Sequence, residues 1–187
     1  MRVLIEKYIS MKLILSGILG AMLMAASPGD QAKSVHDFTM KSISGKEISL
    51  SSYKGKKLLI VNVASRCGFT KQYKDLEALS KKYSGKVVVL GFPANNFGGQ
   101  EPGTDSEIKE FCEKTFSVSF PMFSKISVKG KDRHPLYEFL SNKEKNGGVS
   151  DSPGWNFGKY LVDENGKVLK YFSPMVDPLD KEITEML

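Results

Sequence analysis

Two short apolar runs constrain the fold of this chain more than any other feature. Residues 58–61 are uninterrupted aliphatic side chains, and residues 86–92 repeat the pattern in the sequence KVVVLGF. Runs of this length and composition are typical of strands that are buried on both faces. Between them, Tyr73, Leu76, Leu79 and Tyr83 recur at helical spacing, which predicts a helix over residues 70–83. Because such crossovers are right-handed, the two strands should be parallel neighbours.

The other predicted elements follow from local signals. Phe38–Met40 and residues 47–50 read as a small β-hairpin, and Thr104 with Glu107 forms a capping box for a helix that ends near Phe116. Further elements are a helix from His134-Pro135, a hairpin of residues 159–162 and 167–172, and a last helix opening at Asp177-Pro178. The order predicts an α/β protein of thioredoxin-like fold, in which helices flank a central mixed sheet and a β-hairpin precedes it.

Length and composition exclude several classes of protein. A chain of 187 residues with 41% hydrophobic residues can bury the core of one domain without disulfide support. It holds only two cysteines and two histidines, without ligand spacing, so we expect no metal site. The net charge of +6 is spread over short lysine clusters without interleaved aromatic residues, so we expect no nucleic-acid partner.

The N-terminus is predicted to be a targeting segment. Residues 13–26 carry no charge and follow Lys12, but the run is too short for a comfortable membrane span. We therefore expect a signal peptide at residues 1–26, a polar lead-in at 27–36 and the folded domain at 37–187. The predicted location is periplasmic or extracellular, without stable membrane insertion after the signal is removed. The alternative is a cytoplasmic protein or one anchored by an uncleaved N-terminus.

Cys67 is the first candidate for chemistry. It follows the first buried strand and precedes the predicted helix, beside Arg66 and Gly68. A helix N-terminus and a nearby cation both stabilise a thiolate, whereas a cysteine that only fills the core has apolar neighbours. We therefore predict a reactive thiol.

Three neutral side chains are predicted to converge on the same edge of the sheet. Gln100 lies in a turn-rich loop after the second parallel strand, and Trp155 and Asn156 precede the closing hairpin. If the first strand of that hairpin is antiparallel, its start lies at the carboxyl ends of the parallel strands. An indole N–H and two amides would then surround the sulfur and stabilise negative charge there. Considered one at a time, each residue also has an ordinary structural explanation: the tryptophan would pack in the core, and the two amide side chains would belong to turns.

Three blocks of sequence resemble the signatures of the glutathione peroxidase family. They are VNVASRCGFT (61–70), LGFPANNFGGQEP (90–102) and WNFGKYLVDENG (155–166), and the similarity extends over about residues 35 to 187. The resemblance implies a catalytic tetrad of Cys67, Gln100, Trp155 and Asn156. It also implies a peroxidase that reduces hydrogen peroxide or organic and lipid hydroperoxides, in antioxidant defence. Cysteine stands where animal members have selenocysteine, so slower chemistry is expected, and Ala94 replaces a cysteine that many members carry.

Cys112 permits two interpretations. It shares a predicted buried stripe with Ile108, Phe111, Thr115 and Phe116, which indicates core packing. However, FCEKTFSVSFP (111–121) resembles the block in which thioredoxin-dependent members carry their resolving cysteine. That resemblance implies a sulfenic acid on Cys67, a disulfide with Cys112 and reduction by an external thiol, thioredoxin or glutathione, with no bound cofactor. A disulfide requires Cα atoms within about 7 Å, so the helix would have to unwind locally.

Other classes of protein fit the sequence less well. A dithiol oxidoreductase would have cysteine where Thr70 stands, and a peroxiredoxin would have threonine where Ala64 stands. A cysteine hydrolase needs a histidine base, but no motif places His36 or His134 near Cys67. A peroxide sensor or thiol–disulfide relay of the same fold stays open, because it needs the same two thiols. The short stretch between Gln100 and Trp155 resembles the monomeric branch of the family, so we expect a monomer.

Overall fold

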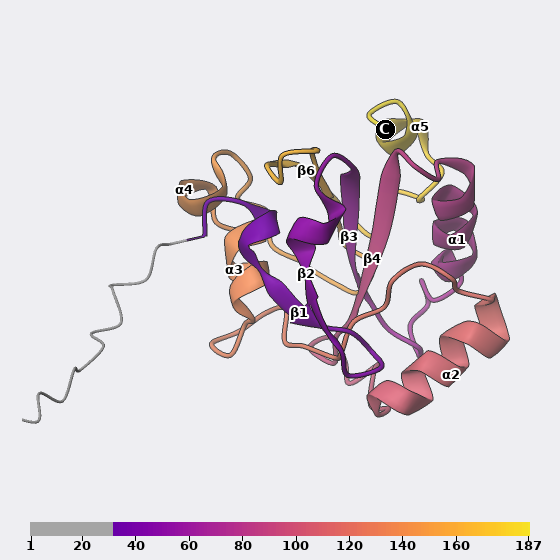
Figure 1. The fold of residues 1–187 in the computed structure, drawn as a ribbon. Helices are drawn as coiled ribbons and strands as arrows, with labels where there is room; N and C mark the ends of the chain where they lie inside the picture. The colour runs from indigo at the N-terminus through magenta and orange to yellow at the C-terminus, as the bar shows by residue number, and fades with distance from the viewer. Residues whose placement is uncertain (1–31) are drawn as a thin grey trace, which may run out of the picture. The chain divides into compact units, whose positions relative to one another are not determined.

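A four-stranded mixed sheet forms the centre of the domain. The structure, a computed structural model, describes residues 32–187, so the predicted signal peptide lies outside the described residues (Figure 1). The strands are β3 (Lys57–Val63), β4 (Val87–Pro93), β5 (Lys159–Val162) and β6 (Val168–Phe172), in the spatial order β4-β3-β5-β6. As predicted, β3 and β4 are parallel, whereas β5 is antiparallel to both β3 and β6.

Helices cover both faces of this sheet. Helices α1 (Gln72–Lys82) and α2 (Asp105–Phe116) lie on one side, and α3 (Pro135–Leu140) lies on the other (Figure 1). The hairpin of β1 (Thr39–Lys41) and β2 (Glu47–Ser49) forms a separate antiparallel pair. Short helices α4 (Lys143–Asn146) and α5 (Lys181–Thr184) and two single 3-10 turns, Val35–Asp37 and Leu50–Tyr53, complete the described part.

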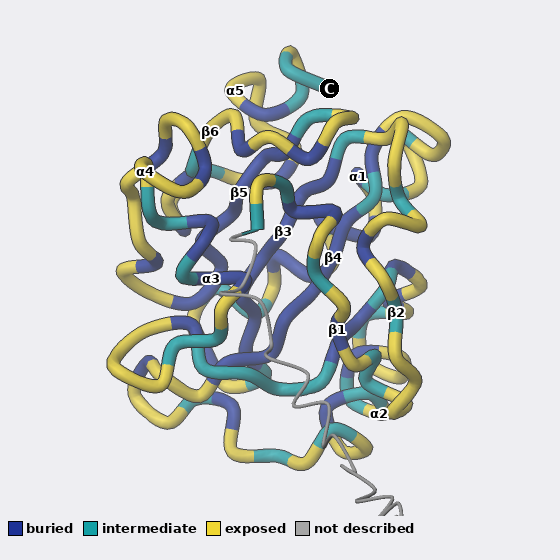
Figure 2. The backbone as a smooth tube through the Cα atoms, turned by 60° about the vertical axis from the view of Figure 1, so that its left-hand side comes forward, coloured by how far each residue is buried: buried dark blue, intermediate teal, exposed yellow. Residues whose placement is uncertain are grey.

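Successive residues of the central strands enter two different apolar clusters. Leu58 and Ile60 of β3 pack with α3, whereas Leu59 and Val61 pack with α1 and α2. This alternation is the two-residue period of a strand whose two faces are both covered. Figure 2 shows the result as continuous burial along β3, β4 and β5. Burial on both faces explains why the sequence of these strands lacks polar alternation.

The predicted capping box forms at the start of α2. The Thr104 hydroxyl accepts a hydrogen bond from the amide of Glu107 at 3.3 Å, and the Glu107 carboxylate accepts one from the amide of Thr104 at 2.7 Å. The helix ends at Ser117, whose φ of 53° is left-handed. Both ends of α2 are therefore set by local sequence.

The structure corrects three local predictions. The last helix begins at Lys181 with Asp180 as its N-cap, because Asp177 caps a separate turn through the amide of Leu179. Thr115, predicted on the buried stripe of α2, is exposed. His36, predicted as an ordinary polar residue, is buried, with its two ring nitrogens 3.1 and 3.2 Å from backbone carbonyl oxygens. Across residues 32–187, the structure contains no helix that is long and apolar enough to cross a membrane.

Candidate active site

Cys67 lies in a tight turn between β3 and α1. Its amide donates a hydrogen bond to the Thr70 hydroxyl at 2.9 Å, and that hydroxyl donates to the carbonyl of Ala64 at 2.8 Å. The amide of Phe69 points at the sulfur and donates to it at 3.4 Å. Only 9% of Cys67 is exposed, so the sulfur is held at the rim of the core. Thr70, which replaces the second cysteine of a dithiol motif, therefore shapes the turn.

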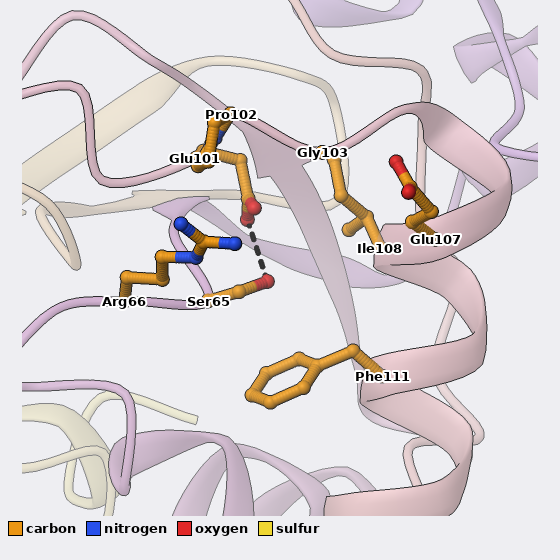
Figure 3. A pocket seen from close by; sticks show the side chains of 8 residues that line it. All are labelled: Ser65, Arg66, Glu101, Pro102, Gly103, Glu107, Ile108 and Phe111. Carbon is orange, nitrogen blue, oxygen red and sulfur yellow. Dashed lines mark hydrogen bonds between the residues drawn. The ribbon is translucent and has the colours of Figure 1, made fainter.

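The N–H group that donates to the Cys67 sulfur does not come from the helix N-terminus, as the sequence had predicted. Helix α1 begins at Gln72, five positions after Cys67, so the thiol does not sit at the first turn of the helix. The single amide of Phe69 supplies the stabilising N–H instead. Arg66 is exposed, and its side chain lines a cavity beside Glu101 (Figure 3).

Gln100 and Asn156 meet at the same edge of the sheet. The Asn156 amide nitrogen donates to the Gln100 side-chain oxygen at 2.9 Å, which joins the loop after β4 to the segment before β5. The amide of Arg66 donates to the carbonyl of Gln100 at 3.0 Å, which joins the same loop to the turn that carries Cys67. The three segments predicted to converge are thus linked by hydrogen bonds. Asn156 is fully buried, and its side-chain oxygen has no partner.

Trp155 offers its indole to solvent. The residue is 40% exposed, which is unusual for the one tryptophan of the chain, and its ring lies 5.7 Å from that of Phe97 in the loop after β4. Its backbone carbonyl accepts a hydrogen bond from the side-chain amide nitrogen of Asn62 at 2.9 Å. Among residues 32–187, no hydrogen bond connects the sulfur of Cys67 with the indole or with either amide side chain. The neutral donors therefore gather at the predicted edge without bonding to the resting thiol.

A cavity of about 370 Å³ lies between the Cys67 turn and α2. Ser65 and Arg66 come from the turn, Glu101 from the loop after β4, and Phe111 from α2 (Figure 3). Glu101 is 1% exposed and accepts a hydrogen bond from the Ser65 hydroxyl at 3.1 Å. Burial raises the pKa of this carboxyl group, although Ser65 and the nearby cations oppose the change. Residues beside Cys67 and residues of α2 line this cavity, and neither cysteine is among its lining residues.

Cys112 is buried in the middle of α2. It is 1% exposed and, like Cys67, belongs to the apolar cluster beneath α1 and α2. Burial raises the pKa of its thiol to about 11, and the nearby Tyr73 hydroxyl opposes that rise. The two groups interact without forming a well-directed hydrogen bond, so the fully buried Tyr73 hydroxyl lacks an ordinary partner. Both cysteines are free thiols. Of the two interpretations of Cys112, core packing therefore agrees with the structure in which both thiols are free.

Sequence reasoning missed several residues around the site. Glu101 follows Gln100 in a turn-rich loop, where a charged side chain is ordinarily exposed. The sequence therefore contains no pattern that predicts its burial. Asn62 and Lys159 interrupt otherwise apolar strands, which is the one signal that marks them. Both histidines bond to backbone groups elsewhere, His36 to two carbonyls and His134 to the amide of Leu136. Among the described residues, no group of three or more histidine, cysteine or acidic side chains is placed to hold a metal ion.

The fold and this site define a thioredoxin-fold protein with a single thiol in the turn after the central strand. A thiol:disulfide interchange protein of the thioredoxin family from Chlorobium tepidum TLS has the same fold, with a TM-score of 0.58 at 18% identity over 84% of this chain and 97% of its own. The family model of glutathione peroxidase matches residues 35–141.

Relatives of that family match nearly the whole described chain. The glutathione peroxidase of Lactococcus lactis subsp. cremoris is 44% identical over 81% of this chain and 98% of its own length. The crystal structure of Trgpx in its apo form superposes with a TM-score of 0.63 at 41% identity, over 82% of this chain and 95% of its own. The chain belongs to the glutathione peroxidase family, as the three sequence blocks predicted.

Proposed function

We propose that the chain performs the peroxidase reaction of its family with the thiol of Cys67. The Cys67 thiolate attacks the terminal oxygen of a hydroperoxide, the O–O bond breaks, and the alcohol or water leaves with a proton. The sulfur is oxidised to a sulfenic acid. The observation that carries this proposal is the Cys67 turn, in which the sulfur of this nearly buried residue accepts an amide N–H, and which is joined by the amide of Arg66 to the linked Gln100 and Asn156 side chains.

Gln100, Trp155 and Asn156 are proposed to stabilise the charge that develops in this step. Their amide and indole groups are neutral donors, which lower the energy of an anion without introducing a competing acid. The Asn156–Gln100 bond supports the assignment, because it fixes the two amides relative to each other and leaves the Gln100 NH₂ group as a donor. The exposed indole of Trp155 supports a substrate approach from solvent.

Cys112 is proposed to resolve the sulfenic acid. Its thiol attacks the Cys67 sulfur, a disulfide forms, and the sulfenic oxygen leaves as water; an external thiol then reduces the disulfide. A pKa of about 11 keeps Cys112 protonated at neutral pH, so it does not compete for peroxide in the reduced protein. Cys67 and Cys112 share one apolar cluster, which supports a short path between them once α2 loosens.

The remaining parts of the proposal rest on sequence. The substrate is hydrogen peroxide or an organic or lipid hydroperoxide, and the reductant is a thioredoxin-like dithiol or glutathione. The apolar run of residues 13–26 supports export, and the short stretch between Gln100 and Trp155 supports a monomer.

Mass spectrometry after one equivalent of hydrogen peroxide tests the mechanism directly. We expect the wild type to lose two hydrogens and to show a peptide pair that links Cys67 to Cys112. Cys112→Ser should stop at a sulfenic acid on Cys67, which dimedone traps, and should lose most turnover with a dithiol reductant. Cys67→Ser should lose all activity, because it removes the attacking sulfur.

Two results would contradict parts of this proposal. Peroxide turnover by Cys67→Ser would refute the assignment of the attacking thiol. Full dithiol-supported turnover by Cys112→Ser would return Cys112 to a packing role and leave the first step intact. Circular dichroism of each variant controls for loss of the fold.

A further inference from the structure

A lysine is buried at the start of β5, three residues after Asn156. Lys159 is fully buried, and its neighbours across the sheet are Val61 of β3 and Phe172 of β6, both apolar. Its ammonium donates to the carbonyl of Phe157 at 2.9 Å and to that of Val176 at 2.8 Å. Burying a lysine is costly unless its donors are used, so a lysine here calls for an explanation beyond packing.

The carbonyl that Lys159 holds belongs to the segment that presents Trp155 and Asn156. Phe157 has a left-handed φ of 68°, which is uncommon for a bulky residue and persists only where surrounding contacts hold it. The amide of Phe157 donates to the carbonyl of Asn62 at 2.6 Å, and the carbonyl of Gly158 accepts from the amide of Asn62 at 3.2 Å. The side chain of Asn62 also holds the carbonyl of Trp155, and Lys159 adds the contact to the carbonyl of Phe157.

There is little room for this segment to adopt another path. A Cβ atom on Gly158 would lie 2.6 Å from the hydroxyl of Tyr171, so the chain passes close to its neighbours at that point. The second acceptor of Lys159, Val176, lies beyond β6 in the segment before α5. The ammonium thus joins the segment that carries Trp155 to the C-terminal part of the fold.

We infer that Lys159 is a positioning residue for the active site, whose ammonium holds the Phe157 carbonyl and thereby orients Trp155 and Asn156. This inference rests on the proposed role of those two residues. Lys159 itself lies under the segment, bonded to the backbone, and acts through it. A lysine that only filled the core would leave the orientation of Trp155 unchanged when its charge is removed.

The charge state of Lys159 supplies a specific test. Burial lowers the pKa of the ammonium to about 8, and the carboxylate of Asp177 opposes that change. Asp177 also interacts with Asp75 of α1, which is close to Lys71 and Lys74 as well. A neutral amine donates weaker hydrogen bonds than an ammonium does. The hold on Phe157 should therefore weaken as the pH rises through about 8.

The first experiment compares Lys159→Met with wild type in the oxidation of Cys67 by hydrogen peroxide under single-turnover conditions. Below pH 8 we expect the variant to be about tenfold slower, because small misplacements of catalytic groups cost large factors in rate. The ratio of wild-type to variant rate should fall as the pH rises through the titration of Lys159, because the wild type then loses the charged donor that the variant lacks at every pH. Lys57→Met is the matched control, since Lys57 is a strand lysine that donates to the carbonyl of Met186.

The second experiment follows the Trp155 side chain directly. Trp155 is the one tryptophan of the chain, so its indole N–H gives a single side-chain resonance. In Cys67→Ser, where the reactive thiol is absent, that resonance should shift with a midpoint near the Lys159 titration, and Lys159→Met should abolish the midpoint. A resonance that does not respond to pH between 7 and 9.5, or a wild-type rate for Lys159→Met, would overturn the inference.

The outcomes separate this inference from the proposed function. If Asn156→Ala and Cys67→Ser retain full activity, the proposed function fails, whatever Lys159 does. If those variants are impaired while Lys159→Met matches wild type at every pH, only the positioning role fails.

Discussion

At the scale of single residues, Trp155 combines exposure with a constrained backbone. Its carbonyl is held by Asn62, and its ring packs against Phe97, yet 40% of the residue is open to solvent. An indole that only filled the core would be covered, since large apolar side chains are normally buried. The geometry therefore favours an indole N–H that is available to a bound peroxide.

Replacing Trp155 with phenylalanine should slow the first oxidation while sparing the fold. The change keeps most of the aromatic surface and removes the N–H donor, and loss of one such donor costs on the order of 10²-fold in rate. Quenched-flow mass spectrometry of Cys67 oxidation measures this rate without relying on fluorescence. Tyr83→Phe, which removes an aromatic donor at the far end of α1, is the control. A wild-type rate for Trp155→Phe would remove the indole from the mechanism.

At the scale of secondary structure, α2 presents a conflict between stability and chemistry. Its capping box, its left-handed end at Ser117 and the burial of Ile108 and Cys112 all favour an intact helix. The resolving step, however, requires the sulfur of Cys112 to leave the helix face and reach Cys67. Opening of α2 is therefore expected to limit disulfide formation.

Weakening the start of α2 should accelerate that step. Thr104→Ala removes the hydroxyl that accepts the amide of Glu107, which should lower the free energy of unfolding by about 1 kcal/mol. Because opening becomes easier, disulfide formation after one equivalent of peroxide should become a few times faster, up to about fivefold for 1 kcal/mol. Asp180→Ala, which uncaps α5, should destabilise the protein without changing that rate. An unchanged rate in Thr104→Ala would show that Cys112 reacts without opening of the helix.

At the scale of the whole molecule, the fold is two apolar clusters divided by one sheet. The cluster beneath α1 and α2 contains both thiols and surrounds Lys159 through Val61 and Phe172, whereas the cluster beneath α3 consists of apolar and aromatic residues. Both thiols and Lys159 thus lie on the side of the sheet that α1 and α2 cover, whereas the Phe97 ring that contacts Trp155 belongs to the other cluster.

The buried lysine should reduce stability most at neutral pH. Its pKa is about 8 in the folded protein and about 10.4 in an unfolded chain, so unfolding takes up a proton between these values. Stability from this group therefore rises with pH between about 8 and 10.4, by as much as about 3 kcal/mol. Urea titrations measure the unfolding free energy of wild type and of Lys159→Met at several pH values. The value for wild type minus the value for Lys159→Met should increase as the pH rises through this range. A constant difference across this range would contradict the lowered pKa.

Most of the secondary structure and the position of the candidate thiol can be predicted from local sequence patterns. The apolar runs specify β3 and β4 as buried parallel strands, the Thr104–Glu107 pair specifies the start of α2, and Cys67 falls in the turn after β3. Each of these follows from short-range pattern, because side-chain periodicity and capping act over one or two turns of chain. The order of the elements predicted the fold correctly, and the three signature blocks predicted the family correctly.

The pairing of polar groups from distant segments could not be predicted in this way, because it depends on how the whole chain folds. Three hydrogen bonds join residues from different segments: Asn156 to Gln100, Ser65 to the buried Glu101, and Lys159 to the carbonyl of Val176. They depend on strand register and loop path, which local pattern does not encode. The same reason explains the errors: Asp177 and Asp180 are both good caps, and packing of the C-terminal segment selects the second to begin the helix.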